Sequence, residues 1–264
     1  MSHEPNTISF NDGAAYERYM GVWSRLAGRE FLAWLSPSRG LRWLDVGCGN
    51  GAFTSLIAEQ CAPASLTGVD PAPAQLAFAR TREWPCPADF REGDAMGLPF
   101  DPHSFDIAVM PLVLFFVPDP AKGVAEMARV VRPGGSVCAY SWDLTGGGFP
   151  YHLAQETLRT LGITVPQPPS KDAVSLEHLP RLWHAAGLAD IRTHEIVVAR
   201  TFTNFDDHWT TLQGGPSLQR PLAGLTPEVH ATYQERLREQ LPTDAHGQIT
   251  YTARAHAVCG RVTR

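Results

Sequence analysis

The stretch Leu44-Asp45-Val46-Gly47-Cys48-Gly49-Asn50-Gly51 constrains the fold of this chain more than any other. Its hydrophobic lead-in, residues 41–43, predicts a short buried strand that ends at Val46. The three glycines predict a tight turn, and residues 52–59 have the spacing of a helix. A strand, a glycine-rich turn and a helix make the first half of a nucleotide-binding βαβ unit, because glycine lets the backbone turn sharply and approach a ligand.

Asp45 indicates which ligand such a turn would hold. In a dinucleotide-binding fold a pyrophosphate lies at the turn, where a helix N-terminus favours negative charge. A carboxylate two residues before Gly47 opposes that ligand. It suits a ligand that carries an ammonium group and a sulfonium, as S-adenosylmethionine does. The segment resembles the first motif of the class I S-adenosylmethionine-dependent methyltransferases.

A second predicted strand, residues 65–70, also ends in an acid. Pro71-Ala72-Pro73 then leads into a helix at 74–81. An acid at the tip of the second strand can accept hydrogen bonds from both ribose hydroxyls, so we expect Asp70 to bind a nucleoside. Its alternative role is a helix N-cap, and the two roles are compatible. Dehydrogenases also carry an acid at this position, so Asp70 does not indicate which cofactor is bound.

A third predicted strand, residues 88–95, ends in Gly93-Asp94-Ala95 and is followed by Met96. This resembles the methyltransferase motif in which an aspartate accepts a hydrogen bond from the adenine amine and the next backbone N–H reaches the ring. The resemblance implies that Asp94 and Ala95 contact adenine and that Met96 packs on the ring face. A dinucleotide fingerprint calls for no acid here, so Asp45 and Asp94 argue against a nicotinamide dehydrogenase.

Residues 104–110 are apolar almost without interruption, which predicts a fourth strand buried on both faces. Ligands of parallel α/β sheets bind beyond the C-terminal ends of the strands. We therefore expect the next segment, 111–117, to wall a cleft. Asp119-Pro120 predicts the start of a helix, and Arg132-Pro133-Gly134-Gly135 predicts its end and a turn into a fifth strand at 136–142. This series also resembles the same family.

The segment from Tyr16 to Arg25 resembles an N-terminal signature of the ubiquinone/menaquinone-biosynthesis-like (type 11) branch, where it folds over the cofactor. Helices are predicted at 14–21 and 24–35. Val22 departs from the signature, since relatives often carry a basic residue there. An amphipathic helix with aromatic residues in the core is the alternative interpretation.

The resemblance covers residues 10–143 and implies an α/β fold with a doubly wound, Rossmann-like sheet. Its seven strands would lie in the order 3-2-1-4-5-7-6 with the last strand antiparallel. Beyond residue 143 the pattern predicts helices at 149–161, 175–186 and 226–241 and strands at 190–203 and 249–262. The predicted parts are N-terminal helices covering the cofactor (1–36), the core (37–143, 175–203 and 248–264), and a helical substrate cap (144–174 and 204–247).

The resemblance and these positions give a set of candidate site residues. The expected cofactor contacts are Tyr16, Tyr19, Met20, Arg25, Asp45, Gly47, Cys48, Gly49, Asp70, Pro71, Gln75, Asp94, Ala95, Met96, Met110, Leu112 and Phe115. The expected substrate pocket consists of Trp23, Phe116, Trp142 and Tyr151.

A general base is harder to place. Some relatives carry Gln or His after the fourth strand, but residues 110–116 hold no titratable side chain. A base must therefore come from the cap or be absent. His152 is the candidate, because it opens the first predicted cap helix just beyond the fifth strand. A packing role for His152 is the alternative.

Composition excludes several other classes. A net charge of -5, a pI of about 6.0 and the lack of a long basic run argue against a nucleic-acid partner. The residues at the start read as no signal peptide, and the longest apolar run, 107–118, is too short to span a bilayer. Five scattered cysteines without a Cys-x-x-Cys pair fit reduced thiols in a cytoplasmic protein and predict no metal site.

These features predict transfer of a methyl group from S-adenosylmethionine to a small, partly apolar acceptor on O, N or C, which leaves S-adenosylhomocysteine. The reaction is an in-line displacement, in which positioning can supply roughly 7–11 kcal/mol. A general base would add about 10²–10⁴-fold. A regulatory protein that binds the cofactor without turnover is the alternative.

Overall fold

The computed structural model of the chain describes residues 17–263. Its contacts divide the chain into two compact units. Among the described residues, the sheet unit comprises 24–145, 169–196 and 255–263, and the helical unit comprises 17–23, 146–168 and 197–254. Each unit is therefore assembled from three separate pieces of chain. The predicted roles of 1–36 as a cofactor cover and of 144–174 and 204–247 as a substrate cap stay predictions.

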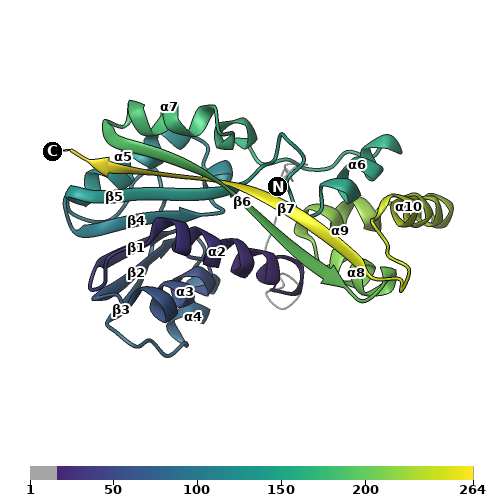
Figure 1. Cartoon of the computed structure of the whole chain (residues 1–264), viewed down its shortest axis with the longest axis horizontal. Coiled ribbons are helices and arrows are strands. Elements are labelled where there is room, and N and C mark those ends of the chain that lie inside the picture. Colours follow the sequence, from purple (N-terminus) through teal and green to yellow (C-terminus); the bar gives the residue numbers. More distant parts are fainter. Residues whose placement is uncertain (1–16, 264) are drawn as a thin grey trace, which may run out of the picture. The chain divides into compact units, whose positions relative to one another are not determined.

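Within the described part of the chain, seven strands form one sheet in the order β3-β2-β1-β4-β5-β7-β6 (Figure 1). The strands are β1 (Arg42–Val46), β2 (Ser65–Asp70), β3 (Ala88–Glu92), β4 (Phe105–Pro111), β5 (Val131–Trp142), β6 (Leu188–Phe202) and β7 (Ile249–Val262). The first five pair in parallel, whereas β7 runs antiparallel to β5. The predicted fold class, strand order and antiparallel last strand are confirmed.

Helices pack on both faces of the sheet unit. On one face, Phe31 of α2 (Val22–Leu35) contacts Phe53 of α3 (Ala52–Cys61) and Tyr140 of β5, at ring centroid distances of 6.1 and 4.7 Å. On the other face, Trp183 of α7 (His178–Ala185) is fully buried and its Nε1 donates to the carbonyl of Val137 at 2.8 Å. Successive strand residues point to opposite faces, so β5 contributes to both layers of the core.

Two further α-helices belong to the sheet unit. α4 (Pro73–Arg80) buries Leu76 and Ala79 in a cluster with Phe90 of β3 and Cys48. α5 (Pro120–Val130) begins after Asp119, whose carboxylate accepts from the backbone N–H of Lys122 and caps the helix.

The N-terminal ends of β1 and β4 are joined by a charged cluster. The Asp106 carboxylate accepts from the backbone N–H of Arg42 at 2.8 Å and from the guanidinium groups of Arg42 and Arg132. Burial raises the pKa of Asp106, but these hydrogen bonds outweigh burial and hold it well below the usual value. This edge of the sheet is therefore tied together by ion pairs, away from the edge where ligands bind in such folds.

The helical unit contains η1 (Glu17–Gly21), α6 (His152–Thr160), α8 (Phe205–Leu212), α9 (Pro216–Ala223) and α10 (Pro227–Gln240). α6 and α10 are joined where the Tyr233 hydroxyl donates to the carbonyl of Ala154 at 3.2 Å. Trp209 of α8 packs against Tyr233 at a ring centroid distance of 5.7 Å. These buried aromatic side chains give the unit a core of its own.

Several predicted elements differ from the structure in their bounds. Residues 17–35 form one unbroken run, η1 and α2, in place of two separate helices. The third strand ends at Glu92 and not at 95, because Gly97 N–H donates to the Asp94 carbonyl and closes a turn. The helix predicted at 149–161 begins at His152. The last strand, 249–262, matches β7.

Helices α8 and α9 were not predicted. Asn204 caps α8 by accepting from the backbone N–H of Asp207 at 2.9 Å, and Asp206 and Asp207 lie in the first turn. An N-cap followed by acidic residues is a recognisable start signal, so α8 could have been found. Every helix among residues 17–263 falls short of the length and apolar character needed to cross a membrane.

Candidate functional site

The glycine-rich turn follows β1 and has the backbone that its sequence predicts. Gly47, Gly49 and Gly51 all have positive φ angles, of 74°, 53° and 80°. The backbone N–H groups of Gly47 and Cys48 both donate to the carbonyl of Val69 in β2, at 2.7 and 3.0 Å. The Cys48 side chain is buried in the cluster around Phe90, so any ligand contact of Cys48 is through its backbone.

Asp45 is a buried carboxylate with one satisfied oxygen. Its Oδ2 accepts from the Thr54 hydroxyl at 2.6 Å, while its buried Oδ1 has no hydrogen-bond partner among the described residues. Burial raises the pKa of Asp45 to about 7, the Thr54 hydrogen bond lowers it and the charge of Asp70 raises it. An ammonium group that reached Oδ1 would satisfy the oxygen and favour its charged form.

This pKa gives a pH-dependent stability. Between about pH 4 and pH 7 the folded protein holds a proton on Asp45 that the unfolded chain has lost, because unfolded aspartate has a pKa near 3.9. The contribution of Asp45 is therefore full below about pH 4, and it falls by ~1.4 kcal/mol per pH unit as the pH rises toward 7. We expect the difference in free energy of unfolding between the parent and Asp45→Asn, measured with urea, to change with pH at this slope. A difference between the two proteins that does not change with pH would contradict the assignment.

Asp70 joins the glycine turn to the start of α4. Its Oδ2 accepts from the backbone N–H of Gly49 and its Oδ1 from that of Ala72, both at 2.9 Å. Burial raises its pKa, and these two hydrogen bonds lower it. Each carboxylate oxygen has a second lone pair, so both can also accept from a ribose. On the same segment, Pro71 is exposed and Gln75 is half-buried.

Asp94 lies in the turn beyond β3. Its Oδ1 accepts from the backbone N–H of Met96 at 2.7 Å, and the side chain is exposed. Ala95 and Met96 are half-buried. Asp45, Asp70 and Asp94 thus stand at or just beyond the C-terminal ends of three neighbouring parallel strands, where the sequence predicts them.

The segment after β4 places apolar side chains at the same C-terminal edge of the sheet. Leu112 has a φ of 59°, unusual for leucine, and its N–H donates to the carbonyl of Tyr140 at 2.7 Å. Phe115 and Phe116 lie in η2 (Leu114–Phe116) with ring centroids 4.5 Å apart. Met110, in β4, is fully buried.

Trp142, at the end of β5, is 1% exposed, and its Nε1 has no hydrogen-bond partner within residues 17–263. A buried indole N–H usually finds a partner, so this donor is available to a ligand group that reaches it. Arg25 is exposed on α2.

The remaining candidates belong to the helical unit. Tyr19 and Tyr151 stack with ring centroids 4.1 Å apart, and the Tyr151 hydroxyl donates to the Tyr19 carbonyl at 2.7 Å. Trp23 Nε1 donates to the Tyr151 hydroxyl at 3.3 Å. Tyr19, Met20, Trp23 and Tyr151 are all at most 5% exposed. This packing fits the alternative interpretation, in which these aromatic residues form a core, and their ligand contacts stay predictions.

His152 is the first residue of α6, and Tyr16 lies outside the described residues. The backbone N–H of His152 donates to the carbonyl of Phe149 at 2.9 Å. The half-buried imidazole of His152 lies beside Gly147. Its role as a base stays a prediction.

Sequence reasoning missed two buried histidines. His256 of β7 is paired in register with Ser141 of β5; its Nδ1 is 3.0 Å from the carbonyl of Val174 and its Nε2 is 3.9 Å from Asp143. In the helical unit, burial and the charge of Arg200 lower the pKa of His208 to about 4. His256 stands between alanines in an apolar stretch of strand, which is the signal that could have found it, whereas His208 directly follows Asp206 and Asp207 and gives no such signal.

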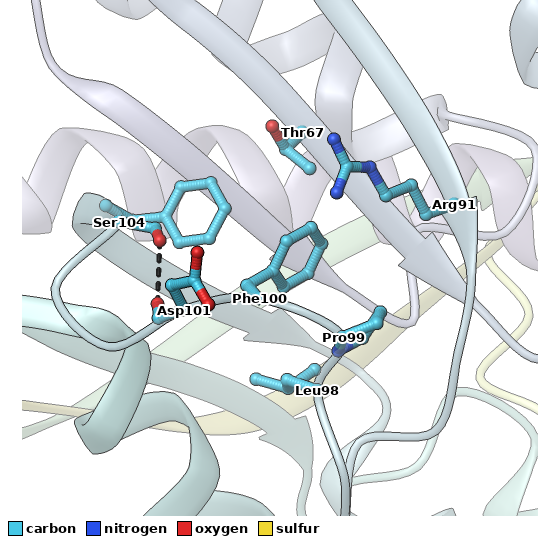
Figure 2. Close-up of a pocket in the computed structure, with 8 residues that line it drawn as sticks. Thr67, Arg91, Leu98, Pro99, Phe100, Asp101 and Ser104 are labelled. Carbon is cyan, nitrogen blue, oxygen red and sulfur yellow. Dashed lines mark hydrogen bonds between the residues drawn. The ribbon is translucent and has the colours of Figure 1, made fainter.

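A separate cavity of about 540 Å³ lies elsewhere on the sheet unit (Figure 2). Its lining includes Thr67 in the middle of β2 and Phe105, the first residue of β4. The Arg91 guanidinium lies 5.3 Å from the ring centroid of Phe100, which also lines the cavity. None of Asp45, Asp70 and Asp94 is among the residues that line it.

Residues 44–139 match the family described as "Methyltransferase domain". The matched residues, called the methyltransferase domain below, are similar to class I S-adenosylmethionine-dependent methyltransferases of the type 11 branch, as the sequence motifs predict. The methyltransferase domain runs from β1 into β5 and contains the glycine turn, Asp70, Asp94 and η2.

The methyltransferase domain has curated relatives. A probable phthiotriol/phenolphthiotriol dimycocerosates methyltransferase 2 from Mycobacterium ulcerans is 32% identical over 163 residues, which cover 56% of this chain and 62% of the relative. A 2-methyl-6-phytyl-1,4-hydroquinone methyltransferase 2 from Oryza sativa is 41% identical over 101 residues, which cover 38% of this chain and 29% of the relative. The chain thus spans less than two thirds of the length of these relatives.

Solved methyltransferase structures share the fold. Phosphoethanolamine N-methyltransferase 2 from Haemonchus contortus, in complex with phosphomonomethylethanolamine and S-adenosylhomocysteine, matches with a TM-score of 0.58. The match covers 95% of this chain and 57% of that chain at 17% sequence identity.

Proposed function

We propose that this protein transfers the methyl group of S-adenosylmethionine to a small, partly apolar acceptor and leaves S-adenosylhomocysteine. The observation that carries the proposal is the placement of Asp45, Asp70 and Asp94 at the ends of three neighbouring strands of the methyltransferase domain. The buried Oδ1 of Asp45 fits a cationic ligand, because an ammonium would supply the hydrogen bond that the described residues do not.

Different residues of the site would hold different parts of the cofactor. Asp45 and the backbone of Gly47, Cys48 and Gly49 would hold the methionine part. Asp70 would accept from the ribose hydroxyls, with Pro71 and Gln75 beside it. Asp94, Ala95 and Met96 would hold the adenine. When bound, S-adenosylmethionine supplies a methyl group already activated by its sulfonium.

The protein's part in the reaction is then mainly alignment of the acceptor and exclusion of water. The apolar side formed by Leu112, Phe115 and Phe116 supports an acceptor with apolar surface. The names of the two curated relatives, a phthiotriol dimycocerosate and a phytyl hydroquinone methyltransferase, support the same class. His152 is the proposed base for an acceptor that must lose a proton.

Isothermal titration calorimetry of the full chain tests cofactor identity. We expect S-adenosylmethionine and S-adenosylhomocysteine to bind in the micromolar range, roughly −8 kcal/mol, and NAD(H) far more weakly. Asp45→Asn should weaken binding, since the ammonium loses a charged partner. Comparable or tighter binding of NAD(H) would rule out the proposal.

A panel of small phenols, quinones and amines, scored by formation of S-adenosylhomocysteine, tests turnover. The lack of a titratable side chain in residues 110–116 favours a second candidate, a regulatory protein that binds the cofactor. Cofactor binding without product from any acceptor class would support that candidate.

A further inference from the structure

Cys138 and Cys259 face each other across two neighbouring strands of the sheet unit. They are register partners in the antiparallel pair of β5 and β7, and their Sγ atoms lie 2.7 Å apart. Directly opposed residues on antiparallel strands have Cα atoms about 4.5–5.5 Å apart. This spacing lies inside the range of about 4.4–6.8 Å that a disulfide spans. The register therefore places the two residues at a backbone spacing that a disulfide can span.

The two thiols differ in their surroundings. The hydrogen bond from Cys138 lowers the pKa of Cys259, burial opposes this, and the positive charge of Arg192 lowers the pKa further. Arg192 is held in place by its hydrogen bond to the carbonyl of Leu35 and by its position 4.7 Å from the ring centroid of Trp34. Burial raises the pKa of Cys138, which remains the proton donor to Cys259. The neighbouring guanidinium and the greater exposure of Cys259 favour Cys259 as the attacking thiol, with Cys138 as the thiol that resolves the mixed disulfide.

We propose that Cys138 and Cys259 form a reversible disulfide when the protein meets a low-molecular-weight disulfide such as oxidised glutathione. The juxtaposed sulfur atoms and the guanidinium beside Cys259 carry this proposal. It goes beyond methyl transfer, since it needs neither cofactor nor acceptor.

The reaction balances as thiol–disulfide exchange. The Cys259 thiolate attacks one sulfur of oxidised glutathione and releases one glutathione thiolate, which takes up a proton. Cys138 then loses its proton and attacks the Cys259 sulfur of the mixed disulfide, which releases the second glutathione. The two protein thiols are oxidised, and their two electrons and two protons appear in the two glutathione thiols.

Burial sets the pace of the reaction. Cys259 is 5% exposed and Cys138 is fully buried. The reagent therefore reaches Cys259 first, and only when the structure opens locally. Once the mixed disulfide forms, the sulfur of Cys138 already lies beside that of Cys259, so the protein disulfide forms without further rearrangement of the two strands.

Mass spectrometry of the full chain treated with oxidised glutathione tests the proposal. We expect the intact mass to fall by about 2 Da and to recover with a reductant. Trypsin under non-reducing conditions should yield a cross-link between residues 255–261, which contain Cys259, and residues 130–159, which contain Cys138. A parent chain that keeps its mass, gains only glutathione adducts or links other cysteines would overturn the proposal.

Matched variants separate the two roles. Cys138→Ser should trap glutathione on Cys259, and Cys259→Ser should lose both the adduct and the cross-link. Cys61→Ser and Cys86→Ser keep the pair and should behave as the parent. Loss of the cross-link in the two control variants would count against the assignment. Peptide mapping of the parent decides the question even if a variant fails to fold, and neither readout depends on methyl transfer.

Discussion

Replacing Gly47 with alanine is expected to lower the free energy of unfolding by roughly 2–5 kcal/mol. Two physical effects add at this position. The φ of 74° is a left-handed conformation that costs an alanine about 1–2 kcal/mol. The new Cβ would also lie 2.5 Å from Cγ2 of Val113 and 2.7 Å from its Cγ1, so the loop after β4 would have to move. Denaturant unfolding followed by circular dichroism measures the loss.

Gly40→Ala is the matched control for the strain. Gly40 has nearly the same φ, 73°, but a Cβ there meets nothing within 4 Å. The free energy of unfolding of the Gly40→Ala variant should fall by about 1–2 kcal/mol only. Val113→Ala removes the two Cγ atoms, so Gly47→Ala should cost less in that background than in the parent. A Gly47 variant that is no less stable than the Gly40 variant would contradict the clash.

Replacing Asp70 with alanine is expected to weaken binding of S-adenosylhomocysteine by roughly 100-fold. The carboxylate would form a pair of charge-assisted hydrogen bonds to the ribose, each contributing about 1.5–3 kcal/mol before water compensates. The variant also removes the acceptor for the N–H groups of Gly49 and Ala72, which loosens the turn that the ligand approaches. Calorimetry of the parent and the variant measures the change.

Two variants isolate the ribose contact. Asp119→Ala removes another aspartate that accepts from a backbone N–H, at the start of α5, and should lower stability with a smaller effect on affinity. Asp94→Asn should cost less affinity than Asp70→Ala, because an amide oxygen can still accept from the adenine amine. An Asp70→Ala protein that binds like the parent would show that the acid at the end of β2 is not a ribose ligand.

The sequence was most informative where function depends on local pattern. The glycine turn and Asp94 each follow a strand in the chain, and Asp70 is the last residue of one, so their positions at the strand ends could be predicted from short motifs. The strand order came from the family resemblance. Helix α8 was missed although Asn204 gave a local signal for its start, and the end of β3 was misplaced because the sequence around Asp94 resembled a continuing strand.

Contacts between distant parts of the chain could not be read in this way. The His256 pairing with Ser141 and the Cys138 pairing with Cys259 both depend on the register of β5 and β7, which no local pattern fixes. The stacking of Tyr19 on Tyr151 likewise joins segments that are 132 residues apart. Such contacts require the assembled fold.

The place of β7 in the sheet also sets the order in which the sheet can be completed. β7 lies between β5 and β6, although β6 precedes it in the chain. During synthesis, β6 therefore has no neighbour in the sheet until residues 255–262 have been made and have inserted beside β5. Until then β5 and β6 each keep an unpaired edge, which can pair with other chains. Five parallel strands can assemble early, whereas β6 can join the sheet only after β7 has paired with β5.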